Sequence, residues 1–254
     1  MKRKKLPVII LSILFITIIF LTLLHDTSIK NRNPKDIENS CMVYYVLNID
    51  GMKGLGHTAF LLIDENANGQ FYSYNGMQYS LMECLMGKAG IGKMKVFSLS
   101  AEEVEQFLLT GDLMVEDAAE CDNFDRALYR YISKADYEQI QESVARYIDV
   151  GNEYERLYAA AFHSNGEEHA AADKELQEFL GQTNLPKYQI YMHNCDVVAR
   201  ELIALIDEEV EIYNAENAKL MPSSNFIGMY NEFGETWGCQ VLGADTTLEK
   251  LFWR

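Results

Sequence analysis

The first hydrophobic feature of the chain is a run of nineteen uncharged residues at positions 6–24, directly after four basic residues at positions 2–5. As a helix rising about 1.5 Å per residue, this run spans about 28 Å, close to the thickness of a bilayer core. No small-residue cleavage motif follows it, so it predicts an uncleaved transmembrane signal-anchor. The basic residues place the N-terminus inside and the remainder outside. We therefore expect a single-pass protein of the cell membrane.

The pattern after this run predicts one further domain. We expect a cytoplasmic stub at residues 1–5, the signal-anchor at 6–24, a polar stalk at 25–40 and an extracytoplasmic domain at 41–254. Alternating or β-rich stretches predict strands, and the Asn- and Gly-containing turn at 65–69 joins two of them into a hairpin. The predicted strands cover residues 41–49, 57–64, 70–75, 93–99, 126–132, 187–192 and 236–242.

Helical periodicity and capping residues predict the other elements. Ser100 and Glu103 form a capping box that opens a helix through Leu109, and Ser133 caps a long helix through about Ala161. That long helix carries its apolar residues on one face. Further helices are predicted at residues 79–86, 167–180 with a stop at Gly181, 195–206, and 223–233 after a proline.

Charge and cysteine content exclude several classes of function. The chain carries a net charge of −16, and without the four positive charges at its start the rest carries −20. Such a domain repels nucleic acid and other polyanions, so we expect no nucleic-acid partner. The five cysteines show no CxxC pair or zinc-ligand spacing. We expect neither a metal nor an organic cofactor.

A nucleophile candidate lies at Cys195. The predicted strand at 187–192 ends just before Asn194, which is a good helix N-cap, so Cys195 falls in the first turn of a helix. The free N–H groups and the partial positive charge of a helix N-terminus favour a thiolate. The backbone N–H groups of Cys195 and Asp196 could also hold an oxyanion. The alternative is that Cys195 is a small buried core residue.

A thiol nucleophile needs a base, and His57 is the leading candidate. It opens a strand after a glycine loop, where small residues let a substrate approach the backbone. A third polar group usually orients such a histidine. Asn75 is predicted for that role, with Gln78 as the alternative. His193 is a second possible base, although its position before the helix directs its side chain elsewhere.

These residues resemble the circularly permuted branch of the NlpC/papain-like superfamily. The resemblance rests on Gly56-His57 before an apolar strand and hairpin, then helical stretches, then a strand leading into Asn194-Cys195 at a helix start. Lecithin–retinol acyltransferase-like proteins and bacterial cell-envelope cysteine hydrolases belong to this branch. Members often carry a second histidine on the strand after the catalytic one, and residues 70–75 contain none.

The resemblance spans about residues 41–235 and implies a permuted papain-like α+β fold, in which a small antiparallel sheet packs against helices. It also implies a membrane-anchored cysteine hydrolase, an amidase, peptidase or acyl hydrolase that works through an acyl-enzyme. A cell-wall peptide or an acyl-lipid would be its substrate, and the N-terminal helix would hold it at the membrane. The alternative is a catalytically inactive papain-like module that binds cell-envelope components. Close approach of Cys195 and His57 in an open cleft would distinguish the enzyme from the module.

Overall fold

The computed structural model describes residues 30–34, 39–51, 56–76, 90–115, 123–190 and 192–243. The predicted signal-anchor at 6–24, the predicted helix at 79–86 and the alternative orienting residue Gln78 lie outside these ranges. Within them, no helix combines the length and the apolar character needed to cross a membrane.

One antiparallel sheet organises the described part of the chain. Its six strands lie in the order β4-β3-β2-β1-β5-β6, so β1 is central and β6 forms one edge. Every pairing in it is antiparallel. The predicted α+β class with an antiparallel sheet packed against helices is therefore confirmed. The strands are β1 (Cys41–Asn48), β2 (His57–Ile63), β3 (Gly69–Asn75), β4 (Lys93–Leu99), β5 (Arg126–Ile132) and β6 (Gly238–Val241).

The β2–β3 hairpin follows the pattern that predicted it. Phe60 pairs with Tyr72 and Ile63 pairs with Gly69. The turn between the strands places Ala67 at φ 65°, a left-handed conformation that the chain needs to reverse within a few residues. Because the side chains of a strand alternate between its two faces, this register also decides which hairpin residues meet each layer of helices.

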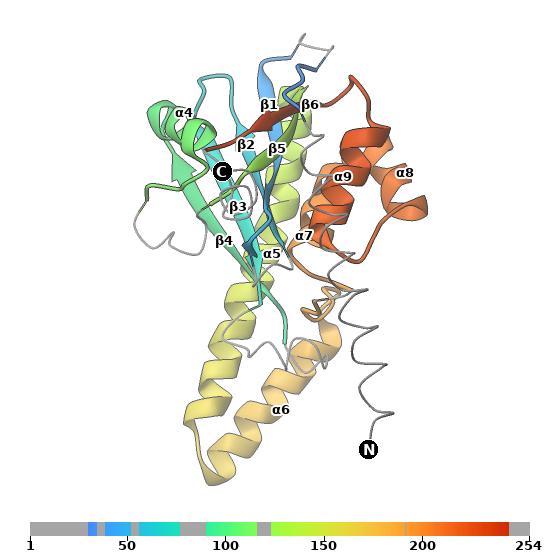
Figure 1. Cartoon of the computed structure of the whole chain (residues 1–254). Coiled ribbons are helices and arrows are strands. Elements are labelled where there is room, and N and C mark those ends of the chain that lie inside the picture. Colours follow the sequence, from blue (N-terminus) through green and yellow to red (C-terminus); the bar gives the residue numbers. More distant parts are fainter. Residues whose placement is uncertain are drawn as a thin grey trace, which may run out of the picture.

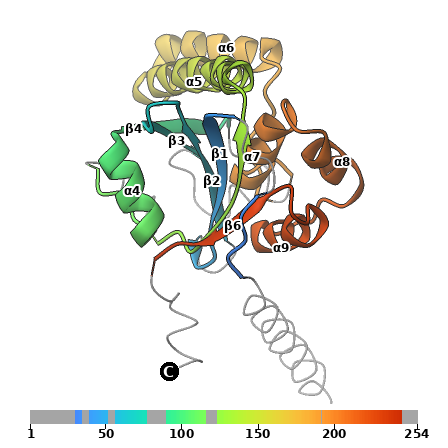
Figure 2. The same ribbon diagram turned by 90° about the horizontal axis from the view of Figure 1, so that it is seen from above.

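The helices form a layer on each face of the sheet. Figure 2 shows α4 alone on one side and α7, α8 and α9 on the other. Helix α5 packs on the α7 side, and α6 packs against α5 in an arm that extends past the sheet (Figure 1). The helices are α4 (Ala101–Thr110), α5 (Lys134–His163), α6 (Gly166–Gln182), α7 (Cys195–Ala204), α8 (Glu208–Glu216) and α9 (Pro222–Glu232).

Two apolar cores result, one on each face. The α7-face core contains alternate residues of β1 such as Tyr45 and Leu47, together with apolar residues of α5, α7, α8 and α9. The α4-face core contains the intervening residues, such as Tyr44 and Val46, and Phe107 from α4. The sheet therefore separates two environments, each with its own set of helices.

The caps predicted from the sequence are present. Ser100 and Glu103 form a capping box at α4, and Ser133 forms one with Asp136 at α5. The capped ends explain why both helices begin where the sequence predicts. Helix α6 runs to Gln182, past the predicted stop at Gly181.

One prediction in the C-terminal half was wrong, and one helix there was not predicted. The predicted strand at 187–192 does not form: Gln189 and His193 make a single bridge around a turn instead. This stretch leads into α7 without a neighbouring strand to pair with. The sequence analysis also missed α8, whose N-cap is Asp207. Four of the nine residues of α8 are Glu, so the sequence shows no clear apolar periodicity there.

Candidate functional site

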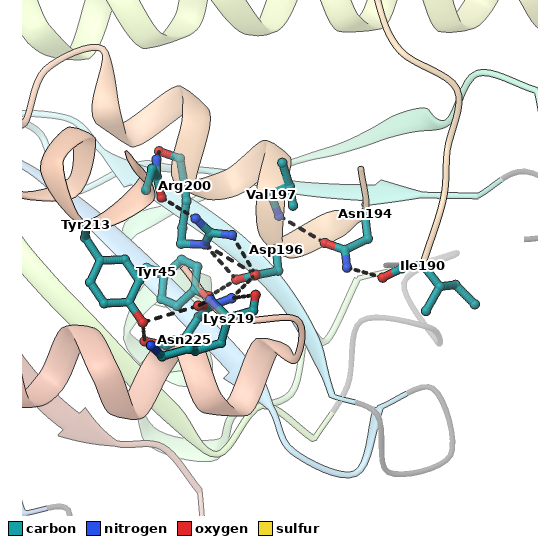
Figure 3. A network of polar contacts seen from close by, with 10 residues as sticks. Tyr45, Ile190, Asn194, Asp196, Val197, Arg200, Tyr213, Lys219 and Asn225 are labelled. Atoms are coloured by element: carbon teal, nitrogen blue, oxygen red, sulfur yellow. Dashed lines mark hydrogen bonds and ion pairs between the residues drawn. The ribbon is translucent and has the colours of Figure 1, made fainter. Parts of the chain in front are cut away.

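Helix α7 places the candidate nucleophile at its first residue. Asn194 is the N-cap: its side-chain oxygen accepts a hydrogen bond from Val197 N at 3.0 Å. Its amide nitrogen donates to Ile190 O at 2.5 Å and so ties the cap to the preceding turn (Figure 3). Asn194 is thus fully engaged in holding the start of the helix. Cys195 lies at the helix N-terminus, where free N–H groups are available.

The Cys195 thiol is buried and protonated at neutral pH. Its residue is 2 % exposed. Burial raises the pKa of Cys195 to about 11, although the backbone N–H of Thr58 acts in the opposite direction. The Thr58 hydroxyl also lies beside the sulfur and lowers this pKa. It has no hydrogen-bond partner among the described residues while Cys195 is a thiol. Desolvation therefore outweighs the helix terminus, which favours the thiolate.

His57 lies on the opposite face of the sheet from Cys195. It precedes Thr58 in β2, and Thr58 is the residue that faces the Cys195 sulfur. Consecutive strand residues point to opposite faces. The His57 ring accordingly lies 6.2 Å from the ring of Phe124, a member of the α4-face core. Strand alternation therefore directs the His57 ring to the α4 face and Thr58 to the α7 face, on which Cys195 lies.

His57 has a hydrogen-bonding partner in a serine of the neighbouring strand. His57 Nε2 lies 2.9 Å from Ser73 Oγ, and both residues are buried. The side-chain amide of Asn75 donates to the same Ser73 oxygen at 3.0 Å and to Ser73 O at 3.2 Å. The predicted orienting residue Asn75 is therefore near His57, and it acts on the histidine through Ser73. We call His57, Ser73 and Asn75 the α4-face relay.

Asp196, next to the candidate nucleophile, belongs to a buried ionic network on the α7 face (Figure 3). Arg200 donates to both carboxylate oxygens of Asp196, with its Nη2 3.0 Å from Oδ2. The Tyr45 hydroxyl donates to Oδ1, and Asn225 Nδ2 donates to Oδ2 at 2.6 Å. The Asp196 side chain is 1 % exposed, as expected of a charge that is fully paired.

The network extends from α7 into α8 and α9. Asn225 accepts a hydrogen bond from Lys219 N at 2.6 Å and donates to Lys219 O at 2.9 Å. The Tyr213 hydroxyl donates to Asn225 Oδ1 at 3.2 Å, and Arg200 also contacts Asn214. We call Tyr45, Asp196, Arg200 and Asn225 the α7-face network. It fixes α7 to β1 and α9, so the Asp196 carboxylate is a structural group here.

Tyr45 remains a hydrogen-bond donor in this network. Burial raises its pKa well above the ordinary value, and the neighbouring Asp196 carboxylate adds to that rise. The phenol is therefore protonated at neutral pH and donates to the carboxylate. A second buried carboxylate, Asp207, is paired with Arg130 and accepts from Trp237 Nε1 at 3.2 Å. Both carboxylates join helices to the sheet.

His193 is the histidine that shares a face with Cys195. Its ring packs edge-on against Tyr74 at 5.7 Å between centroids, within the α7-face core. Burial lowers the pKa of His193 to about 4, so the imidazole is neutral at physiological pH. Its Nε2 atom is buried and has no hydrogen-bond partner among the described residues. The second candidate base thus lies in the α7-face core, on the side of the sheet that carries helix α7.

Sequence reasoning missed the ionic partners of Asp196. Asp196 and Arg200 are four residues apart on α7, a spacing that brings opposite charges together on one helix face. That signal was present in the sequence. The hydrogen bonds of Tyr45 and Asn225 to Asp196 come from elements distant in the sequence, and no local pattern predicts them. Among the described residues, no group of His, Cys, Asp or Glu side chains is arranged to hold a metal ion.

Comparisons with protein-family models, with curated proteins and with solved structures found no match to this chain.

Proposed function

We propose that this chain is a papain-like binding module of the cell envelope, held at the membrane by its apolar N-terminal run. The observation that supports this function over hydrolysis is the placement of His57 and Cys195 on opposite faces of the sheet. A general base must lie within about 3.2 Å of the proton that it removes, or reach it through one water. Strand alternation directs these two side chains to different faces of the sheet.

The state of the thiol supports the same proposal. Thiolate, not thiol, is the nucleophile. With the pKa of Cys195 raised to about 11, the reactive form is scarce at neutral pH. In active cysteine hydrolases the neighbouring histidine shifts this pKa in the opposite direction. Here the residue facing the sulfur is Thr58, which cannot accept the proton at neutral pH.

Hydrolysis remains the second candidate, and the position of Cys195 favours it. The sulfur lies at the first residue of a capped helix and beside the backbone N–H of Thr58, an arrangement suited to an oxyanion. His193, on the same face, would then replace His57 as the base. An acyl-enzyme on Cys195 would require the thiol to become accessible.

Thiol alkylation of the full chain in detergent tests the two candidates. Labelling by iodoacetamide is followed against pH and assigned to each cysteine by mass spectrometry, because Cys41 and Cys239 are also buried cysteines. We expect Cys195 to react slowly, with an apparent pKa above the free-thiol value of about 8.5. His57→Ala should leave that rate unchanged.

Two matched variants complete the test. Cys195→Ser identifies the Cys195 signal, and His193→Phe removes the remaining histidine on that face. Rapid labelling of Cys195 with an apparent pKa below about 8.5, slowed by His57→Ala or by His193→Phe, would contradict the binding module and establish a thiol hydrolase.

A further inference from the structure

Residues 30–34 lie against the edge of the sheet although they precede the domain in sequence. Arg32 and Cys239 exchange two backbone hydrogen bonds, from Arg32 N to Cys239 O at 2.8 Å and from Cys239 N to Arg32 O at 2.6 Å. This is an antiparallel bridge to β6, the edge strand. Val241 N, two residues further along β6, donates to Asn31 Oδ1 at 2.8 Å. The segment therefore satisfies groups that an edge strand otherwise leaves open.

The side chain of Arg32 occupies a defined site. Its guanidinium carbon lies 4.5 Å from the centre of the Tyr230 ring, a cation–π geometry. Its Nε donates to Trp237 O at 2.9 Å, and its Nη1 donates to Tyr230 O at 3.1 Å. Two carbonyl oxygens and one aromatic face thus select a planar, multiply donating cation, which is arginine rather than lysine.

Residues on both sides of Arg32 also form hydrogen bonds with the domain. Asn33 Oδ1 accepts from the Tyr129 hydroxyl at 3.2 Å, and Lys30 N donates to the Tyr230 hydroxyl at 3.3 Å. A Cβ atom at Gly238 would lie 2.5 Å from Tyr129 Cζ and 2.7 Å from Pro34 Cδ, so the Tyr129 ring and the segment together leave no room for a side chain there. We call β6 with Tyr129, Tyr230 and the carbonyl of Trp237 the edge site.

We propose that the edge site recognises an extended, arginine-bearing peptide segment of a partner protein, and that residues 30–34 occupy it in cis. This inference rests on the proposed binding function and names its partner class. Addition of a strand to an edge gives affinity through main-chain hydrogen bonds, and side-chain sites give sequence preference. The net charge of −20 that follows the basic start of the chain attracts a cationic segment.

The cis segment is a replaceable occupant. It contributes a single bridge, and the Nη2 atom of Arg32 is buried without a hydrogen-bond partner among the described residues. A partner that satisfied this nitrogen, or that paired along more of β6, would bind better than residues 30–34. Residues 30–34 then compete with a partner peptide for the edge site, so only peptides that bind more tightly than this segment displace it.

The test uses the full chain and a fluorescent peptide that copies residues 28–36, read by fluorescence anisotropy. Arg32→Ala in the protein removes the cation–π contact and both charge-assisted hydrogen bonds of the cis segment. We expect this variant to bind the peptide at least about tenfold more tightly than the wild type does. The same peptide carrying Arg32→Ala should bind neither protein.

Tyr230→Ala, added to the Arg32→Ala protein, is the matched control for the site and should abolish peptide binding. Circular dichroism and the melting temperature establish that each variant is folded. Failure of the folded Arg32→Ala protein to bind the peptide would overturn the proposal, as would binding that survives Tyr230→Ala. Either result leaves residues 30–34 as a purely structural strap. Thiol reactivity of Cys195 is unaffected by these changes, so failure here is distinguishable from failure of the proposed function.

Discussion

The two faces of the sheet hold their buried polar groups in different ways. On the α7 face, Asp196 and Arg200 carry full charges and are paired with each other and with Tyr45 and Asn225. On the α4 face, the relay of His57, Ser73 and Asn75 is built from hydrogen bonds of uncharged side chains to Ser73. A buried charge requires many partners, whereas a short relay requires few. The first arrangement fixes helices to the sheet, and the second joins only two neighbouring strands.

The comparison also separates two neighbours in the sequence. His57 and Thr58 are adjacent in β2, yet one enters the relay and the other faces Cys195. A shift of β2 by one residue would exchange their environments. The register of the hairpin, fixed by the pairing of Phe60 with Tyr72, therefore decides whether the thiol faces a histidine or a threonine.

The largest effect is expected from breaking the α7-face network. Asp196→Ala leaves Arg200 buried without its carboxylate partner, and we expect a loss of about 3–5 kcal/mol in the free energy of unfolding. Urea unfolding followed by circular dichroism measures it. Glu153→Ala is the matched control, because Glu153 pairs with Arg156 at 2.7 Å on the exposed surface of α5, and it should leave the midpoint unchanged. Equal midpoints for the two variants would show that the network does not hold the helices.

Much of the fold could be predicted from the sequence because its signals are local. The β2–β3 hairpin rests on alternation around a turn at Ala67, and the starts of α4 and α5 rest on capping boxes at Ser100 and Ser133. The predicted strand at 187–192 failed because a strand also needs a neighbour. Gln189 and His193 find only each other. Such pairing is a property of the whole sheet and is not visible in a short stretch.

The candidate site was harder to predict than the fold. The position of Cys195 at the start of α7 and the capping residue Asn194 follow from local pattern. Whether Cys195 faces His57 or Thr58 depends on which face of β2 packs against α7. That choice depends on how the apolar residues of the helices on both sides of the sheet pack against it. Because β2 is buried on both faces, its sequence from Ala59 to Ile63 is apolar without alternation and does not mark the α7 side.

A smaller effect distinguishes the histidine of the α7 face. His193 has a folded-state pKa of about 4 because of burial, below the ordinary value of about 6.5. Between these values the unfolded chain binds a proton that the folded protein does not, so stability falls as the pH falls through this window. Above it, the full contribution is present.

His193→Phe keeps an aromatic ring against Tyr74 and removes the titration. Between about pH 7 and pH 4.5, we expect the wild type to lose about 2.5 kcal/mol more than this variant does. Urea unfolding at the two pH values gives the difference, and carboxylates that titrate equally in both proteins cancel. Parallel losses in the two proteins would mean that His193 is protonated in the folded state.

The smallest expected change in stability comes from removing one of two buried hydroxyls, one on each face of the sheet. Ser73→Ala removes the oxygen that His57 Nε2 and the Asn75 amide share, and leaving buried polar atoms unpaired costs about 1–3 kcal/mol. Thr58→Val removes a buried hydroxyl that has no hydrogen-bond partner among the described residues while Cys195 is a thiol, so stability should stay the same or rise slightly. Urea unfolding measures both changes.

Because the Thr58 hydroxyl lowers the pKa of Cys195, Thr58→Val should also slow alkylation of that thiol, and Ser73→Ala should not. If Ser73→Ala instead altered the alkylation rate, the relay would communicate with Cys195 across the sheet, and the separation of the two faces on which the binding module rests would fail.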